Sequence, residues 1–241
     1  MLEGSCRKDV ICLYSGGKDS HLAACLLVKE GYRVHLVTFE NGAGMAGKNA
    51  EHGAKRMIER FGDDAVKYLG LYSTVSFWRE FFLPFFNMKP VEIQQEFGQI
   101  TISQFNCLSC RSAMYVVAIK LADQHQITAI ADGARSIQGF VIELPCMIEQ
   151  FKSFLNEYGL EFLYPVLELE NDWRLKNLLL SYGFVPKTIE PQCLLGAPLK
   201  GIPDEEIQEA VVKCFRQLIV PKAKELINDE QFGLTKGADF I

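Results

Sequence analysis

Short apolar segments alternate along this chain with longer segments whose apolar residues recur at helical spacing. The short segments predict buried strands at 10–14, 33–39, 65–72, 127–131 and 162–169. The longer ones predict helices at 19–29, about 49–61, 111–124 and, with Asp172 as its N-cap, up to residue 181. This alternation predicts an α/β fold with a doubly wound, mostly parallel five-stranded sheet covered on both faces. Ligands of such sheets bind beyond the carboxyl ends of the strands.

Two regions depart from the alternation. An insertion at about 75–105 carries aromatic residues at helical spacing, and we interpret this stripe as core packing or a dimer contact, with a lid over the site as the alternative. The stripe consists of Phe77, Trp78, Phe81, Phe82, Phe85 and Phe86. From residue 203 the pattern predicts an amphipathic docking or dimer helix, which Pro221 ends or kinks. We therefore expect one domain over 1–202, a helical extension over 203–241, and a homodimer.

Composition and charge narrow the classes of protein. With 49% hydrophobic and 23% charged residues the chain is globular. Charges interrupt every apolar stretch before about 18 residues, so no membrane helix is expected. Residues 1–9 lack the apolar core of a secretory signal, which favours a cytoplasmic protein. The net charge of −5 argues against a broad phosphate-binding surface and predicts weak affinity for RNA in general.

A glycine-containing motif joins the first predicted strand to the first predicted helix. Residues 15–20 read Ser-Gly-Gly-Lys-Asp-Ser. Paired glycines let the backbone approach an anion closely, and the helix N-terminus supplies free N–H groups and a positive dipole end. Ser15 and Ser20 add hydroxyls, Lys18 adds a positive charge, and Asp19 is a candidate Mg²⁺ ligand. The motif indicates a polyphosphate site but lacks the spacing of the kinase and GTPase loop.

At these residues the chain resembles the PP-loop (N-type) ATP pyrophosphatase superfamily, whose signature is Ser-Gly-Gly-x-Asp-Ser after the first strand. The resemblance implies an adenine nucleotide alpha-hydrolase-like fold, with ATP and Mg²⁺ as cofactors. It implies adenylation of a substrate carbonyl with release of pyrophosphate, after which sulfur or nitrogen displaces AMP. It also assigns residues. The phosphates and Mg²⁺ would lie on Ser15, Gly16, Gly17, Asp19 and Ser20, and adenine on backbone groups at Thr38 and Phe39.

Two further segments carry polar or glycine-rich patterns. Residues 42–47 match G-x-G-x-x-G, but the acidic residue expected at the end of the next strand is missing, so a dinucleotide site receives little weight. These glycines favour a loop that moves over the nucleotide. After the fourth strand the resembled family often carries polar residues beside the reacting carbonyl, which makes Asp132 a candidate for Mg²⁺ or substrate contact and Arg135 for phosphate contact. A helix cap and a surface arginine are the alternative interpretation of these two residues.

Eight cysteines are many for a chain in a reducing compartment. Cys107 and Cys110 form a C-x-x-C pair where the predicted helix at 111 begins, and Cys193 follows much later. Three interpretations compete: a structural zinc site, a redox dithiol, and a 4Fe-4S cluster whose three cysteine ligands leave one iron open. The other cysteines read as small buried hydrophobic residues. These are Cys6, Cys12, Cys25, Cys146 and Cys214.

A C-x-x-C in the middle of a PP-loop domain and a single late cysteine are similar to iron–sulfur tRNA thiolation enzymes, such as the 2-thiocytidine and 2-thiouridine synthetases. The resemblance implies that Cys107, Cys110 and Cys193 bind the cluster, that Cys193 also takes part in catalysis, and that the protein is an adenylating sulfurtransferase. A sulfur donor protein is an implied partner. Because no paired zinc ribbon and no basic tail accompany the motifs, we expect a small-molecule acceptor or one specific RNA feature. The alternatives are a PP-loop amidotransferase or ligase and a non-catalytic ATP- or redox-sensing module.

Overall fold

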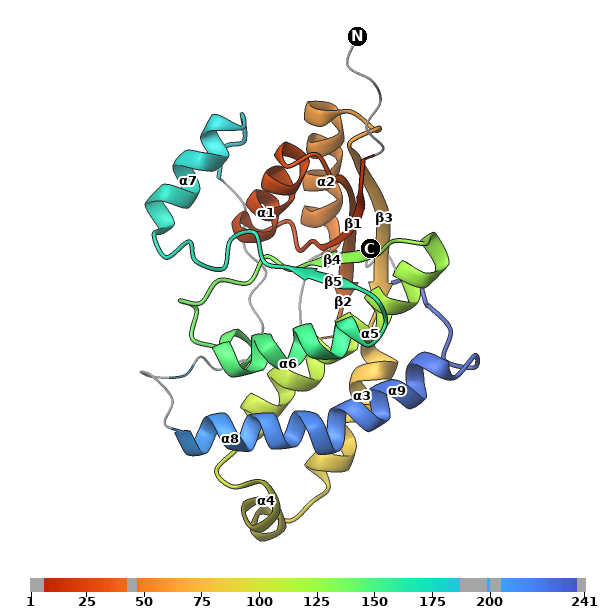
Figure 1. Ribbon diagram of the computed structural model, residues 1–241, viewed down its shortest axis with the longest axis vertical. Coiled ribbons are helices and arrows are strands. Elements are labelled where there is room, and N and C mark those ends of the chain that lie inside the picture. Colours follow the sequence, from red (N-terminus) through yellow and green to blue (C-terminus); the bar gives the residue numbers. More distant parts are fainter. Residues whose placement is uncertain (1–6, 43–46, 187–198, 200–204, 238–241) are drawn as a thin grey trace.

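The computed structural model describes residues 7–42, 47–186, 199 and 205–237, and its centre is a parallel sheet (Figure 1). The strands are β1 (Asp9–Leu13), β2 (Arg33–Glu40), β3 (Val66–Ser73), β4 (Ala129–Ala131) and β5 (Glu161–Leu163). They lie in the order β3-β2-β1-β4-β5, and every neighbouring pair is parallel. The α/β fold class predicted from the alternation is confirmed.

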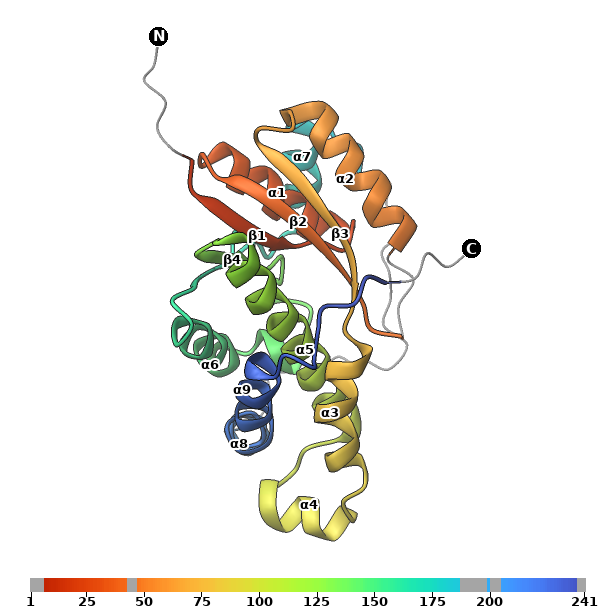
Figure 2. The same ribbon diagram turned by 90° about the vertical axis from the view of Figure 1, so that its right-hand side faces the viewer.

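Helices cover both faces of this sheet (Figure 2). One face packs against α1 (Lys18–Lys29), α2 (Gly47–Phe61) and α7 (Asp172–Ser181). The other packs against α5 (Ile102–His125) and α6 (Pro145–Asn156). Side chains of β1 alternate between the two cores, with Val10 and Cys12 in one and Ile11 and Leu13 in the other, as the two-residue period of a strand requires.

The insertion forms α3 (Val75–Phe86), α4 (Pro90–Phe97) and the first turns of α5. Its aromatic stripe is largely core. The buried members are Phe77, Phe81, Phe82 and Phe85. Phe85 stacks on Phe105 of α5 with ring centroids 3.9 Å apart, while Phe86 is 53% exposed. Core packing is therefore confirmed for the inner face of the stripe.

Several predicted boundaries were wrong for local reasons. The helix expected from residue 111 begins at Ile102, because Thr101 and Gln104 cap it reciprocally. The fifth strand ends at Leu163 rather than at 169, and turns follow it. Asn171, not Asp172, is the N-cap of α7, since the Asn171 side chain accepts hydrogen bonds from two backbone N–H groups. Helix α6, which covers the sheet between β4 and β5, was missed.

The predicted C-terminal helix does not end at Pro221. It consists of α8 (Glu205–Cys214), a π-helical segment (Phe215–Ile219) and α9 (Val220–Asn228). The geometry changes just before Pro221, which has no N–H to continue the preceding hydrogen-bond ladder. These helices share the core of α3, α5 and α6, where Cys214 and Phe215 are buried. Within the described part of the chain, no helix combines the length and apolar character needed to cross a bilayer.

Candidate functional site

The Ser-Gly-Gly-Lys-Asp-Ser loop lies between the carboxyl end of β1 and the N-terminus of α1. Gly16 adopts φ +76°, and a Cβ there would lie 2.8 Å from Ala50 Cα, so the turn requires glycine. Gly17 is the N-cap of α1. The Ser20 hydroxyl donates to the Gly17 carbonyl at 3.1 Å and lies 3.2 Å from the Ser15 hydroxyl. These bonds hold the loop in shape and leave the first N–H groups of α1 at the site.

A second loop, which follows β4, packs directly on the first. A Cβ on Gly133 would lie 2.7 Å from Ser20 Cα, so the two backbones touch. Because β1 and β4 are neighbours whose connections run to opposite sides of the sheet, their carboxyl ends form the switch point at which α/β sheets bind ligands. No sequence pattern singled out Gly133, although its place directly after Asp132 was a usable signal.

The two loops enclose a cavity of about 670 Å³, a size within the range of small-molecule sites. The lining side chains come from β1, β2, α1, α5 and the loop after β4. Those that the argument uses are Ser15, Lys18, Asp19, Phe39, Arg111, Met114, Asp132, Arg135 and Gln138. No residue of the aromatic stripe lines this cavity, so the described insertion residues do not act as its lid.

Charged side chains at the mouth of the cavity form a linked group. Arg135 is only 3% exposed, and its Nε lies 2.9 Å from Asp19 Oδ1. Gln138 donates to the other Asp19 oxygen at 2.7 Å. Arg135 Nη2 also donates to Asp172 Oδ1 at 2.9 Å, and Lys18 Nζ lies 3.6 Å from the same oxygen. The interpretation of Arg135 as a surface arginine is therefore wrong, and Gln138 and Asp172 join the site without having been predicted there.

Asp132 lies at the floor of the site and is 2% exposed. Its carboxylate accepts hydrogen bonds from Arg111 Nη1 and Tyr115 Oη, both at 2.7 Å, and from the Ala134 N–H at 3.0 Å. Burial disfavours the charged Arg111, but the surrounding acidic groups, Asp132 foremost, together outweigh it and raise the pKa of Arg111. Burial and then the Asp132 charge raise the pKa of Tyr115, which thus donates as a neutral phenol. Asp132 is placed to hold Arg111 at the cavity wall.

The second strand supplies one support and one lining residue. Thr38 is fully buried, and its hydroxyl donates to the Tyr14 carbonyl at 2.8 Å, which fixes the point where β1 leads into the loop. Phe39, the next residue, turns to the opposite face of the strand and lines the cavity. Thr38 and Phe39 thus lie beside the loop, and their contact with adenine stays a prediction.

Cys107 and Cys110 lie one turn apart on α5 rather than before it. They share a helix face with Arg111 and Met114, which line the cavity one turn further along. Asn41, directly after β2, donates from Nδ2 to Cys110 Sγ at 3.2 Å, so this pair lies at the carboxyl edge of the sheet. Neither sequence pattern nor motif indicated Asn41.

Two features predicted for the site fall outside the described residues, as does Cys6, which was predicted to be buried. Cys193 is one, so its expected convergence with Cys107 and Cys110 stays a prediction. Residues 43–46, the centre of the G-x-G-x-x-G segment, are the other. Among the described residues, no three His, Cys, Asp or Glu side chains form a group that would hold a metal ion. A metal ion or cluster on the C-x-x-C pair would therefore need at least one further ligand from elsewhere.

A Ser-Gly-Gly-x-Asp-Ser loop at the switch point of a parallel β3-β2-β1-β4-β5 sheet, facing a second loop after β4, defines the PP-loop ATP pyrophosphatase class. Comparison with protein families agrees with this class. The family model ThiI, described as thiamine biosynthesis protein, matches residues 5–138, more than half of the chain, and the protein belongs to this family.

Individual relatives are more distant or match a shorter segment. An uncharacterized protein of Methanocaldococcus jannaschii is 51% identical over 47 residues, which are 20% of this chain and 24% of that protein. A 4-thiouridine synthetase, solved as an RNA complex with bound ATP, has a TM-score of 0.57 at 15% identity and covers 95% of this chain. This chain spans 55% of the synthetase. The similarity to the synthetase supports the fold.

A further solved structure is the U34-tRNA thiolase NcsA from Methanococcus maripaludis with its 4Fe-4S cluster. It matches with a TM-score of 0.44 at 13% identity and covers 92% of this chain and 73% of that chain.

Proposed function

We propose that the protein is an ATP-dependent adenylating sulfurtransferase. An acceptor carbonyl oxygen would attack the α-phosphorus of ATP, and the bond to the β-phosphate would break with pyrophosphate leaving. Sulfide sulfur would then attack the activated carbon, and AMP would leave with the former carbonyl oxygen. The observation that carries this proposal is the cavity of about 670 Å³ in which the N-terminus of α1, Lys18 and Arg135 face one space.

The residues of the site supply electrostatic stabilisation. Negative charge develops on the leaving pyrophosphate, and the positive dipole end at the start of α1 favours an anion there. Lys18 and Arg135 add two positive charges at the same wall of the cavity. Because Arg135 is buried and held by Asp19 and Asp172, its guanidinium is positioned before any ligand arrives.

Asp19 suits Mg²⁺, since a carboxylate at the cavity wall is the oxygen ligand that this ion prefers. Its two oxygens contact Arg135 and Gln138, so bound Mg²⁺ would share this carboxylate with one or both of them. Bound Mg²⁺ would neutralise charge on the phosphates. Gln138 is the more readily displaced partner because it carries no charge.

Cys107 and Cys110 suit two corners of a 4Fe-4S cluster, because cysteine thiolates hold such clusters and the pair precedes by one turn Arg111 and Met114, which line the cavity. Cys193 is the proposed third ligand. Such a cluster would offer its open iron to sulfide supplied by a donor protein. Asn41 would donate a hydrogen bond to a ligating sulfur, an arrangement that orients metal ligands in many sites.

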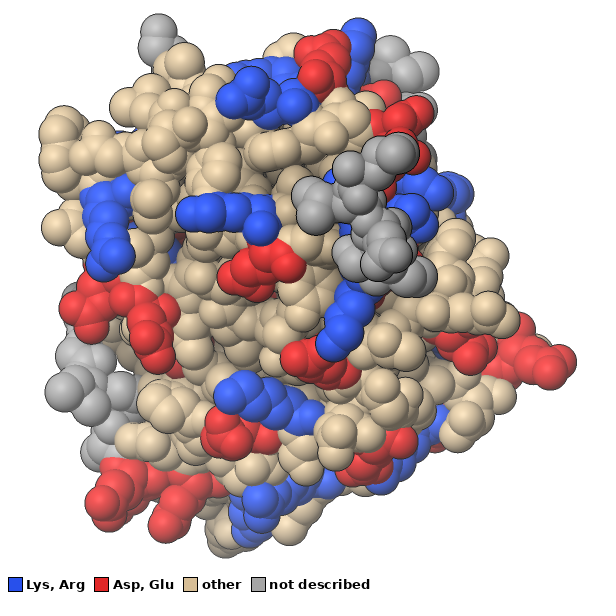
Figure 3. All heavy atoms as spheres, turned by 45° about the horizontal axis from the view of Figure 1, so that its top comes forward, with Lys and Arg blue, Asp and Glu red and all other residues tan. Residues whose placement is uncertain are grey.

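The acceptor is proposed to be a small molecule or one specific RNA feature. Basic and acidic side chains are interspersed on the face that Figure 3 presents, and the net charge is −5. RNA bound through many phosphates would require a basic surface and would show a steep salt dependence. Tight binding of bulk tRNA at physiological salt, with such a slope, would favour the RNA acceptor.

Product analysis tests the adenylation step. ATP incubated with the anaerobically prepared protein, sulfide and candidate acceptors should yield AMP and pyrophosphate. Asp19→Ala should abolish turnover while the far-ultraviolet circular dichroism stays unchanged. Asp63→Ala, an exposed carboxylate in the turn before β3, is the matched control and should keep full activity. ADP and phosphate as products would contradict the proposal, and ATP binding without turnover would favour a sensing module.

A further inference from the structure

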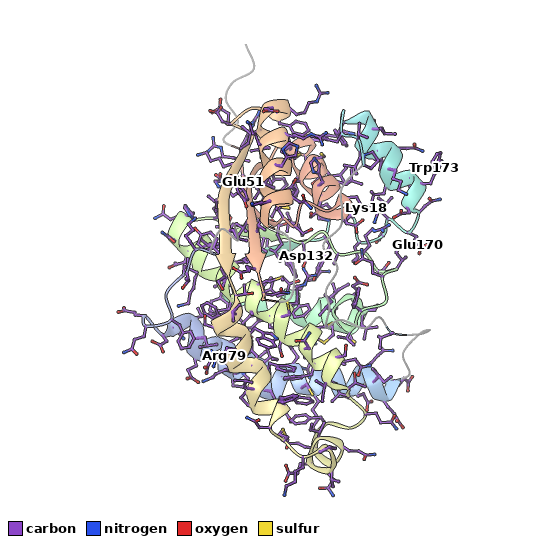
Figure 4. All side chains as sticks on the ribbon, turned by 180° about the vertical axis from the view of Figure 1, so that it is seen from behind. Lys18, Glu51, Arg79, Asp132, Glu170 and Trp173 are labelled. Carbon is purple, nitrogen blue, oxygen red and sulfur yellow. The ribbon has the colours of Figure 1, made fainter. Side chains whose placement is uncertain are left out.

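Asp172, the first residue of α7, approaches the two cations of the proposed phosphate site. Its Oδ1 lies 2.9 Å from Arg135 Nη2 and 3.6 Å from Lys18 Nζ. Figure 4 shows Lys18 beside the start of α7, near Trp173 on that helix and Glu170 just before it. Asp172 itself is not part of the cavity lining, so it reaches these cations from outside the cavity. A carboxylate thus contacts both groups that a polyphosphate would need.

The burial of the three side chains differs strongly. The side chains of Arg135 and Lys18 are 4% and 16% exposed, whereas that of Asp172 is 46% exposed. The cations are therefore fixed at the wall, and the carboxylate can return to water at lower cost. Burial alone would raise the pKa of Asp172, but Lys18, Lys176 and Arg135 together lower it. Asp172 is therefore ionised when a nucleotide arrives.

Asp172 has a further positive partner, Lys176, which would remain after phosphate replaced Asp172 at Lys18 and Arg135. Lys176, four residues later on α7, lies 3.3 Å from the other carboxylate oxygen of Asp172. If phosphate takes over Lys18 and Arg135, Asp172 keeps Lys176 and does not lose every counter-charge. Arg135 in turn keeps its contact with Asp19 and its hydrogen bond to the Leu169 carbonyl at 3.2 Å.

We propose that Asp172 sets the affinity of the nucleotide site for polyphosphate by competing with it for Lys18 and Arg135. This inference rests on the proposed function, because it assumes that ATP places its phosphates in this cavity. It goes beyond that function because the negative charge that competes with phosphate lies on α7, outside the loops after β1 and β4. The competition lowers the affinity for pyrophosphate and for ATP alike. Because pyrophosphate is the proposed product, its release is faster.

The test compares Asp172→Asn with Glu170→Gln, an exposed carboxylate two residues earlier. Calorimetry measures binding of inorganic pyrophosphate, ATP and adenosine by the full chain at low and physiological salt. Asp172→Asn should bind pyrophosphate and ATP about three- to tenfold more tightly, as expected for one or two partly exposed ion pairs, with a steeper salt dependence. Adenosine binding should stay unchanged, and Glu170→Gln should match the wild type.

Lys176→Met provides the reciprocal variant. Without Lys176, Asp172 depends more on Lys18 and Arg135, so pyrophosphate and ATP should bind about two- to fivefold more weakly. In the double variant with Asp172→Asn this weakening should disappear, which a double-mutant cycle measures. A merely structural role would make Asp172→Asn bind pyrophosphate more weakly.

The outcomes separate the two proposals. If the wild type binds ATP but Asp172→Asn binds pyrophosphate equally well or more weakly, the competition is overturned and the proposed function stands. If the wild type binds neither ATP nor pyrophosphate, the proposed function fails and this inference fails with it. Thermal unfolding of each variant identifies a loss of binding that comes from misfolding, and in that case Asp172→Ser and Asp172→Glu repeat the comparison. The glutamate keeps the charge and should restore the weaker, wild-type binding.

Discussion

Arg111 donates a 2.7 Å hydrogen bond to Asp132 and thereby joins the helix of the cysteine pair to the loop of the proposed phosphate site. Arg111 lies directly after Cys110 on α5, and Asp132 follows β4. Both side chains line the same cavity, and the Asp132 carboxylate is buried. A change at either residue is therefore transmitted to both chemical motifs.

Asp132→Asn should strongly destabilise the fold. The change leaves the Arg111 cation without its buried carboxylate, and breaking such a pair costs on the order of 3 kcal/mol. Urea unfolding measures the loss. The control is Asp123→Asn at an exposed position on α5, the helix that carries Arg111. It should change the free energy of unfolding by less than about 0.5 kcal/mol. Equal stabilities for the two variants would show that the Arg111–Asp132 pair is dispensable.

Gly133→Ala should disturb the contact between the two loops. The new Cβ would lie 2.7 Å from Ser20 Cα and 2.9 Å from Ser20 N, and backbone atoms cannot move aside as a flexible side chain can. We expect a loss of about 1–3 kcal/mol in stability together with weaker ATP binding. Gly233→Ala is the matched control, because a Cβ at Gly233 would meet no atom within 4 Å. Unchanged ATP affinity in Gly133→Ala would argue against the phosphate site.

Glu143 should make the stability of the protein depend on pH. It lies in a short 3-10 helix (Val141–Glu143) and is 4% exposed. Burial raises the pKa of Glu143 from 4.5 to about 7. The folded state then holds a proton that the unfolded state releases, so stability falls as pH rises through this window. The fall attributable to Glu143 is on the order of 3 kcal/mol.

Glu143→Gln tests this assignment, since the amide stays neutral at every pH. The decline in the free energy of unfolding between pH 4.5 and 7 should become smaller in this variant. Glu149→Gln, whose side chain is 69% exposed, should keep the wild-type profile. If the profiles of the wild type and Glu143→Gln coincide, Glu143 does not titrate in this window.

The three proposed cluster ligands should be equivalent in a reconstitution experiment. Cys107→Ser, Cys110→Ser and Cys193→Ser should each lose iron and sulfide to a similar extent, although Cys193 is far away in sequence. Iron and sulfide assays on anaerobic preparations, with absorbance spectra, measure this. Cys146→Ser is the control and should retain the cluster. If only the variants of Cys107 and Cys110 had an effect, the pair would be a local dithiol or a zinc site.

Much of the fold was predictable because the signals are local. These signals are short apolar strands, helical periodicity, and Gly31 and Gly183 directly after helices. Each depends only on neighbours in sequence, and together they predicted the parallel sheet. The loop at residues 15–20 was recognisable for the same reason: its glycines, hydroxyls and helix start are consecutive. The early start of α5 was missed although its reciprocal cap, Thr101 with Gln104, is itself a local signal. Helix α6 was missed in the segment between β4 and β5.

The composition of the site depended on tertiary structure. By itself the sequence determined the phosphate loop, the C-x-x-C pair and the polar residues after β4, since each is a contiguous motif placed after a strand. Only the packing of α7 and the β4 loop against α1 decided that Asp172 meets Lys18 and that Gly133 touches Ser20. Only the packing of α5 beside the β4 loop decided that Arg111 pairs with Asp132. These partners are distant in sequence, and no local periodicity encodes a contact that exists only when separate elements converge at one edge of a sheet.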